Sequence, residues 1–144
     1  MAEPRLLDDL FGVNDRFRRS VNLAADYRRG EALSGYVVTP LVRMVLQRIG
    51  AGLGQRALNR AWSLTGPYGA GKSACGVFLS QLLGYPVHGA TRDQLWRQDR
   101  PVAEELWRHV PGLDSGGFLM VPIVGSRQPL AWTLLMGLMQ YATS

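Results

Sequence analysis

The chain has 144 residues, a formal net charge of +5, one cysteine and 47% hydrophobic residues. This length is enough to bury about 70% of the surface that the unfolded chain exposes. No uninterrupted apolar stretch approaches the ~20 residues that cross a bilayer, and no basic segment followed by an apolar core opens the sequence. Cys75 alone excludes an internal disulfide and a multi-cysteine metal site. We expect a cytoplasmic protein without membrane contact.

The positive charge has two interpretations. The arginines are spread from Arg5 to Arg127, and their densest group is Arg16, Arg18 and Arg19. Clustered basic residues are the usual footprint of nucleic-acid binding, whereas dispersed ones are typical of a solvated basic surface. The dispersion favours the solvated surface, and nucleic acid stays open as a partner.

Residues 1–39 form a lead-in to the first clearly predicted helix. Mixed charge and scattered apolar positions from Leu6 to Arg29 predict a short helix and irregular chain. Thr39-Pro40 is typical of a helix start, with an N-cap followed by proline at the first helical position. Apolar residues then recur at helical spacing until glycines 50, 52 and 54 end the helix: Leu41, Val42, Val45, Leu46 and Ile49.

A glycine-rich loop follows the next apolar segment. Ala61–Thr65 predicts a short strand that runs into Gly66-Pro67-Tyr68-Gly69-Ala70-Gly71-Lys72-Ser73. Ser73–Leu83 predicts an apolar helix, which Gly84 stops. This order of strand, loop and helix is the context in which a phosphate-binding loop occurs.

The remaining chain predicts further helices and one more strand. Thr91–Val110 predicts a helical insert, at about residues 91–110, broken near Asp99. Phe118–Val124 is a near-continuous apolar run, typical of a buried parallel strand, although Pro122 is unusual in a central strand. Leu130–Tyr141 predicts a final helix. The order of elements predicts an α/β fold, an incomplete P-loop NTPase-like parallel sheet covered by helices, over residues 40–144.

Lys72 is the only lysine among sixteen basic residues, and the others are arginines. In the pattern Gly-x-x-x-x-Gly-Lys-Ser the compact ammonium of the lysine reaches the β- and γ-phosphates. The wider, planar guanidinium of an arginine does not fit this position. The glycines let main-chain N–H groups converge on phosphate oxygens, and Ser73 is the expected Mg²⁺ ligand. We therefore predict that ATP and Mg²⁺ bind at Gly66, Pro67, Tyr68, Gly69, Ala70, Gly71, Lys72 and Ser73.

On these residues the chain resembles the P-loop NTPase superfamily. The form of the loop is most similar to that of the additional-strand ATPases, the AAA+ and STAND-like group. Residues 61–83, with the lead-in Gly35–Pro40, are similar to the N-terminal region of large bacterial ATP-binding proteins, some from phage-defence loci. The resemblance implies an ATPase that couples nucleotide binding and hydrolysis to conformational change, with a protein partner or further domains of a longer chain.

Hydrolysis in this superfamily needs a Walker B strand that ends in an aspartate. The apolar run after Ser73 ends in Val124-Gly125-Ser126 without a carboxylate, and Asp114 precedes that run. Glu104 and Glu105 lie in the helical insert. We therefore assign no catalytic residue, leave open whether the chain is itself an enzyme, and expect it to be an N-terminal fragment of a longer ATPase.

Two alternative functions stay open. A small-molecule kinase shares the loop and closes an arginine-bearing lid, for which the insert offers Arg92, Arg97, Arg100 and Arg108. A non-catalytic module with a vestigial P-loop would bind nucleic acid or protein without nucleotide.

The sequence also predicts where several single residues lie. We expect Cys75 to be a small buried residue and Tyr68 to pack against the protein. The four tryptophans are expected in the core or at a partner surface: Trp62, Trp96, Trp107 and Trp132.

Overall fold

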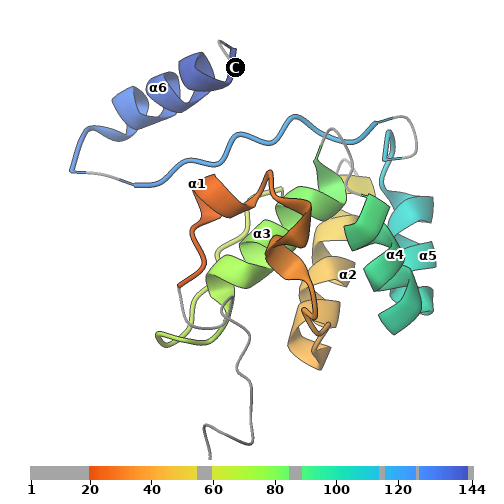
Figure 1. Cartoon of the computed structure of the whole chain (residues 1–144). Helices are drawn as coiled ribbons and strands as arrows, with labels where there is room; N and C mark the ends of the chain where they lie inside the picture. The colour runs from red at the N-terminus through yellow and green to blue at the C-terminus, as the bar shows by residue number, and fades with distance from the viewer. Residues whose placement is uncertain (1–19, 55–59, 85–88, 114–115, 126, 143–144) are drawn as a thin grey trace, which may run out of the picture.

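The computed structural model describes residues 20–54, 60–84, 89–113, 116–125 and 127–142. In these ranges, two short helices come first, α1 (Leu23–Asp26) and the 3₁₀ helix η3 (Gly30–Leu33). Five longer helices follow (Figure 1): α2 (Pro40–Gly54), α3 (Lys72–Leu83), α4 (Gly89–Gln98), α5 (Arg100–His109) and α6 (Leu130–Ala142). Most of the segment before Arg29 that was predicted to hold a short helix lies outside the described residues.

The predicted α/β fold is wrong, because the described residues form an all-helical arrangement without a sheet. Their strand-like pairing is one parallel bridge between Gly84 and Phe118, in which the Phe118 N–H donates to the Leu83 carbonyl at 2.7 Å. Both predicted strands, 61–65 and 118–124, are irregular chain. An apolar segment becomes a strand only where a neighbour pairs with its main-chain groups, and in the described ranges such pairing is limited to the bridge at Phe118.

The helices predicted after residue 39 are confirmed, with small shifts at some ends: α3 begins at Lys72 rather than Ser73, and α4 at Gly89 rather than Thr91. The Thr39 hydroxyl accepts a hydrogen bond from the Val42 N–H at 3.3 Å at the start of α2. The N–H of Gly84, the residue after α3, donates to the Ser80 carbonyl. The insert divides at Asp99, whose side chain caps α5 by accepting from the Val102 N–H. These starts and stops depend on local capping chemistry, which a single sequence carries.

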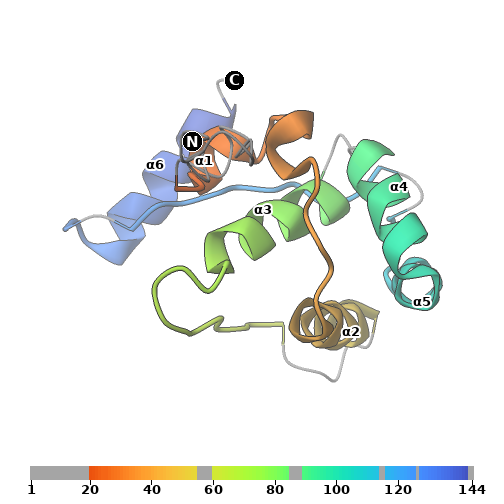
Figure 2. The ribbon, with the colours of Figure 1, turned by 60° about the horizontal axis from the view of Figure 1, so that its bottom comes forward.

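Helix α3 runs through the middle of the assembly (Figures 1 and 2), with α1 and η3 along one side and α4 at its C-terminal end. Helices α2 and α5 pack on each other. The large apolar side chains that are completely buried come from α2, α3, α4 and the turn after α5: Leu46, Val77, Phe78, Leu82, Leu95 and Leu113. Burying one such side chain stabilises the fold by about 1.5–3 kcal/mol.

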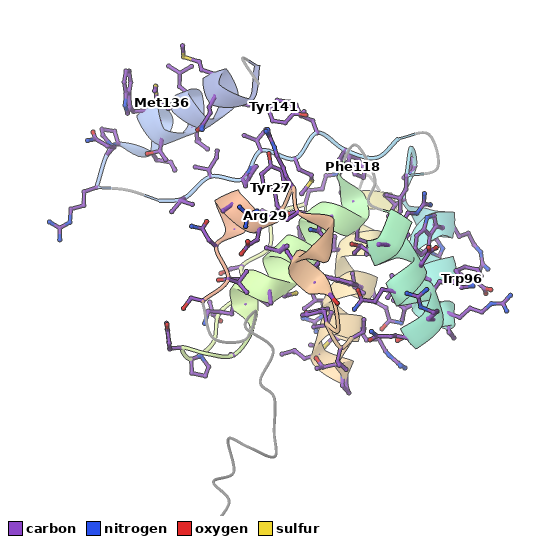
Figure 3. The ribbon with its side chains drawn as sticks, viewed as in Figure 1. Tyr27, Arg29, Trp96, Phe118, Met136 and Tyr141 are labelled. Carbon is purple, nitrogen blue, oxygen red and sulfur yellow. The ribbon has the colours of Figure 1, made fainter. Side chains whose placement is uncertain are left out.

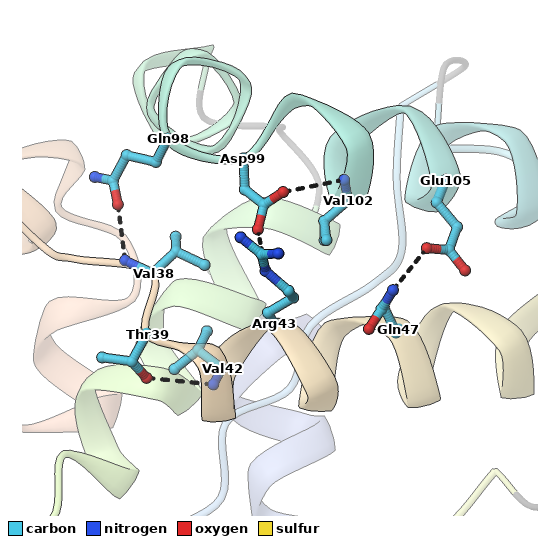
Figure 4. Close-up of polar contacts among 9 residues, drawn as sticks. All are labelled: Val38, Thr39, Val42, Arg43, Gln47, Gln98, Asp99, Val102 and Glu105. Atoms are coloured by element: carbon cyan, nitrogen blue, oxygen red, sulfur yellow. Dashed lines mark hydrogen bonds and ion pairs between the residues drawn. The ribbon is translucent and has the colours of Figure 1, made fainter.

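Polar contacts join α2 to α5 beside this core (Figure 4). The Arg43 guanidinium lies 2.6 Å from the buried carboxylate of Asp99, and the Gln47 side chain donates to Glu105 at 3.0 Å. Because Asp99 also caps α5, one carboxylate fixes both the start of α5 and its position against α2. Two of the four acidic residues of the insert thus face α2.

Helix α6 stands apart from the other helices and lies along residues 121–123 (Figures 1 and 3). A Cβ atom on Gly137 would lie 2.8 Å from Ile123 Cγ1, so glycine allows this close approach. The large apolar side chains of α6 are exposed: Leu130, Trp132, Leu134, Leu135, Met136, Leu138 and Met139. None of the described helices combines the length and the apolar character that crossing a membrane requires.

Candidate nucleotide-binding site

The glycine-rich loop leads directly into α3 (Figure 2). Gly69 and Gly71 have φ angles of +80° and +77°, in the left-handed region that favours glycine. Gly71 is the N-cap of α3, and no side chain caps this helix. The first N–H groups of a helix have no acceptor within it, and together with the helix dipole they attract an anion. The loop therefore ends at uncapped main-chain donors.

Lys72 folds back onto the loop that precedes it. Its ammonium donates to the carbonyl of Gly66 at 2.8 Å and to that of Pro67 at 2.6 Å. The side chain is half-buried, and these two bonds hold the ammonium against the loop. This is the position from which a single ammonium reaches the oxygens of a polyphosphate held by the same main chain.

Ser73 was predicted to bind Mg²⁺, and Tyr68 was predicted to pack against the protein. Ser73 is exposed in the first turn of α3, next to Lys72. Tyr68 is 95% exposed, so its predicted packing role is wrong. The Ala70 N–H donates to the Pro67 carbonyl, which makes Tyr68 and Gly69 the central residues of a tight turn. A side chain at the first central position of such a turn projects outward.

A hollow of about 150 Å³ lies beside the loop. Its walls come from the lead-in, from α2 and from both ends of the loop segment, including Tyr36, Val37, Val45, Leu64, Gly71 and Lys72. Pockets for drug-sized ligands have volumes of about 300 Å³ or more, so this hollow has room for one ring system. The loop pattern predicted Gly71 and Lys72 as site residues but not Tyr36, Val37 or Val45, because these three come from other parts of the sequence.

Cys75 and Tyr36 both line the hollow. The prediction that Cys75 is buried is confirmed, since 5% of it is exposed. Burial raises the pKa of the Cys75 thiol, and a hydrogen bond with Tyr36 offsets part of this rise. Burial also raises the pKa of Tyr36, and the neighbouring Cys75 adds to the shift. Both groups are therefore uncharged at neutral pH and place no negative charge near Lys72.

Two further predictions concern a Mg²⁺ site at Ser73 and an arginine-bearing lid over the loop. No three His, Cys, Asp or Glu side chains gather within the described ranges to hold a metal, so a Mg²⁺ ion here would take Ser73 and phosphate oxygens as ligands. The arginines of the insert lie on α4 and α5, at the opposite end of α3 from the loop (Figure 1). A helix of 12 residues, about 18 Å long, separates them from Lys72.

A scan of the sequence against protein-family models and searches of curated proteins and of solved structures found no match to this chain.

Proposed function

We propose that this chain binds ATP with Mg²⁺ through residues 66–73, as the nucleotide-binding part of an ATPase that couples nucleotide binding to conformational change. The observation that supports it best is the contact of the Lys72 ammonium with the Gly66 and Pro67 carbonyls. A lysine held there, in front of the uncapped start of α3, offers a cation and several N–H donors to one polyphosphate.

The bound triphosphate would replace the loop carbonyls as the partner of Lys72. Two carbonyl dipoles are weaker partners for an ammonium than phosphate oxygens with full negative charge. Ser73, exposed in the same helical turn, would place its hydroxyl on the Mg²⁺ that bridges the phosphates. This proposal depends on the loop and on α3, not on a sheet.

The hollow next to the loop supports a nucleoside triphosphate rather than a free polyphosphate. It adjoins Gly71 and Lys72, and apolar side chains from the lead-in and α2 line it. A flat, largely apolar ring fits such a wall, whereas phosphate does not. We therefore place the base of the nucleotide between Val37 and Val45 in this proposal.

Calorimetric titration with a non-hydrolysable ATP analogue and Mg²⁺ tests the proposal. We expect the wild-type chain to bind and Lys72→Ala to lose binding. Arg60→Ala removes an exposed cation just before the loop and serves as the matched control, with unchanged affinity. Equal affinity of the wild type and Lys72→Ala would refute the proposal.

A second variant tests where the base binds. Val45→Phe enlarges a half-buried side chain that lines the hollow, and we expect it to weaken ATP binding while leaving pyrophosphate binding unchanged. Met44→Phe, on the exposed neighbouring position, is its control. An equal loss of ATP and pyrophosphate affinity in Val45→Phe would show that the base does not occupy the hollow.

A further inference from the structure

Four side chains form a continuous row of contacts across the outer face of α4 and α5, which we call the Arg–Trp ladder. The Arg92 guanidinium carbon lies 4.8 Å from the centre of the Trp107 ring. The Trp107 and Trp96 rings meet edge to face, with centres 6.3 Å apart. The Arg100 guanidinium carbon lies 5.0 Å from the centre of the Trp96 ring. Cations and aromatic rings thus cover one helical face together.

The Trp96–Arg100 half of the ladder faces solvent, whereas Arg92 and Trp107 are half-buried and the Trp107 indole nitrogen is buried. Trp96 is 44% exposed, and the side chain of Arg100 is 67% exposed. Figure 3 shows Trp96 on the side of the molecule away from α6 and the loop. A hollow of about 350 Å³, lined by Arg92, Asp93, Trp96 and Trp107, opens along the same face. A large exposed aromatic side chain at such a hollow is typical of a binding surface.

The charges of the insert are divided between its two sides. Asp99 and Glu105 face α2, where Arg43 and Gln47 bind them (Figure 4). On the outer side, Glu104 is paired with Arg100 at 2.8 Å, and Asp93 is the other acidic residue there. Helical spacing places four arginines on or next to this side: Arg92, Arg97, Arg100 and Arg108. The outer face therefore has an excess of positive charge and fits an anionic partner.

We propose that the Arg–Trp ladder binds single-stranded nucleic acid. Unstacked bases stack on tryptophan rings and on the planes of arginine side chains, and the ladder offers two neighbouring rings with an arginine at each end. The surrounding arginines match the phosphates that run between successive bases. A duplex keeps its bases stacked internally and offers the ladder phosphates only. This surface is separate from the proposed nucleotide site and does not depend on it.

Fluorescence anisotropy of a labelled single-stranded thymidine oligomer of about 12 nucleotides tests the proposal on the full chain. We expect Trp96→Ala to raise the Kd about 5-fold to 150-fold, the range measured for loss of one stacking ring. Trp62→Ala is the matched control, because Trp62 is 43% exposed and lies outside the ladder. Equal Kd values for Trp96→Ala and Trp62→Ala would overturn the proposal.

Salt dependence provides a second readout that does not require removal of a ring. Arg100→Gln should lower the slope of log Kd against log salt concentration by about 0.7, as expected for one lost contact to a single strand. Arg48→Gln, at an exposed position of α2, should leave the slope unchanged. An unchanged slope in Arg100→Gln would contradict a phosphate contact at the ladder.

Competition separates this partner from the others that an arginine-rich face could attract. We expect unlabelled single strands to displace the probe far better than a duplex of equal length or a polyglutamate of equal charge. Displacement by duplex or polyglutamate at equal concentration would overturn the proposal, because neither uses the rings. Lys72→Ala should bind the oligomer like the wild type, and a loss as large as in Trp96→Ala would place the nucleic acid at the loop instead.

Discussion

Gln98 of α4 is bound to Val38 of the lead-in, whose N–H donates to the Gln98 side-chain oxygen at 2.7 Å. The amide nitrogen of the same side chain donates to the Tyr36 carbonyl at 2.7 Å. One glutamine thus pairs with the main chain on both sides of Val37, much as a neighbouring strand would (Figure 4 shows the Val38 contact). Since Tyr36 and Val37 line the hollow beside the loop, α4 holds one wall of the candidate nucleotide site.

Gln98→Ala should therefore weaken both the fold and nucleotide binding. It leaves the Val38 N–H and one bond of the Tyr36 carbonyl without their partner, which we expect to cost about 1 kcal/mol in the free energy of unfolding. Urea denaturation measures this loss, and titration with the ATP analogue should show weaker binding. Arg97→Ala, at the neighbouring exposed position of α4, should change neither. A Gln98→Ala chain with wild-type stability would show that the lead-in is held by other contacts.

Gln81 has a similar role in the core, where it is completely buried. Its amide nitrogen donates to the carbonyls of Asp26 and Arg29, at 3.3 and 2.7 Å. Its oxygen accepts from the Thr91 hydroxyl at 2.8 Å. The side chain therefore joins α3 to the lead-in and to α4 at once, and all of its partners depend on an amide that both donates and accepts.

Gln81→Glu should be destabilised at neutral pH by about 1–3 kcal/mol, because a carboxylate cannot donate to two buried carbonyls. A protonated carboxyl donates one bond, so the folded state should raise the pKa of the introduced acid above its unfolded value of about 4.3. The lost stability should accordingly return as the pH falls through the raised pKa. Urea denaturation of both chains between pH 7 and 4 measures the difference, and a difference that does not change with pH would contradict this role.

Helices could be predicted from the sequence because their ends and faces are local. The Thr39 cap, the Gly84 stop and the Asp99 break each depend on groups within four residues. Strands could not be predicted in this way. Phe118–Val124 has the composition of a buried strand. Whether it forms a strand depends on whether another segment pairs with it, and the observed pairing is one bridge at Gly84. Apolar content alone does not decide between a strand and unpaired chain.

In the candidate site, too, the local features could be predicted from the sequence and the long-range ones could not. The loop residues from Gly66 to Ser73 are contiguous, and the pattern predicts a helix from Ser73, which in the structure begins one residue earlier at Lys72. The hollow combines Tyr36, Val45 and Leu64, which are far apart in sequence, so no spacing predicts it. The Arg–Trp ladder lies between these cases. Arg92 and Trp96 are four residues apart on α4, and Arg100 and Trp107 are seven apart on α5, but the two pairs meet only because α5 folds back on α4.

Gly71→Ala should cost stability because of main-chain conformation alone. The φ angle of Gly71 is +77°, and an added Cβ would meet no atom within 4 Å, so steric crowding plays no part. Holding alanine in the left-handed region costs about 1–2 kcal/mol, and relaxation of the loop should also weaken binding of the ATP analogue. Gly125→Ala, where a Cβ also meets no atom within 4 Å and the φ angle is ordinary, should be neutral or stabilising by up to about 1 kcal/mol. Equal unfolding free energies for the two variants would contradict this account.

Cys75 should make the fold sensitive to alkali. Its ordinary pKa is 9.0, and burial raises the pKa of the folded thiol above that value. Above pH 9 the unfolded chain therefore loses this proton while the folded chain keeps it, and the free energy of unfolding falls by up to about 1.4 kcal/mol per pH unit. Tyr36, with an ordinary pKa of 10.0 that burial also raises, should add a second decline above pH 10.

Cys75→Ser keeps a hydroxyl that can bind Tyr36 and does not ionise, so it should remove the first decline and retain the second. Urea denaturation of both chains from pH 8 to about 11 measures the contrast, and parallel stability curves would show that the thiol ionises equally easily in the folded and unfolded chains.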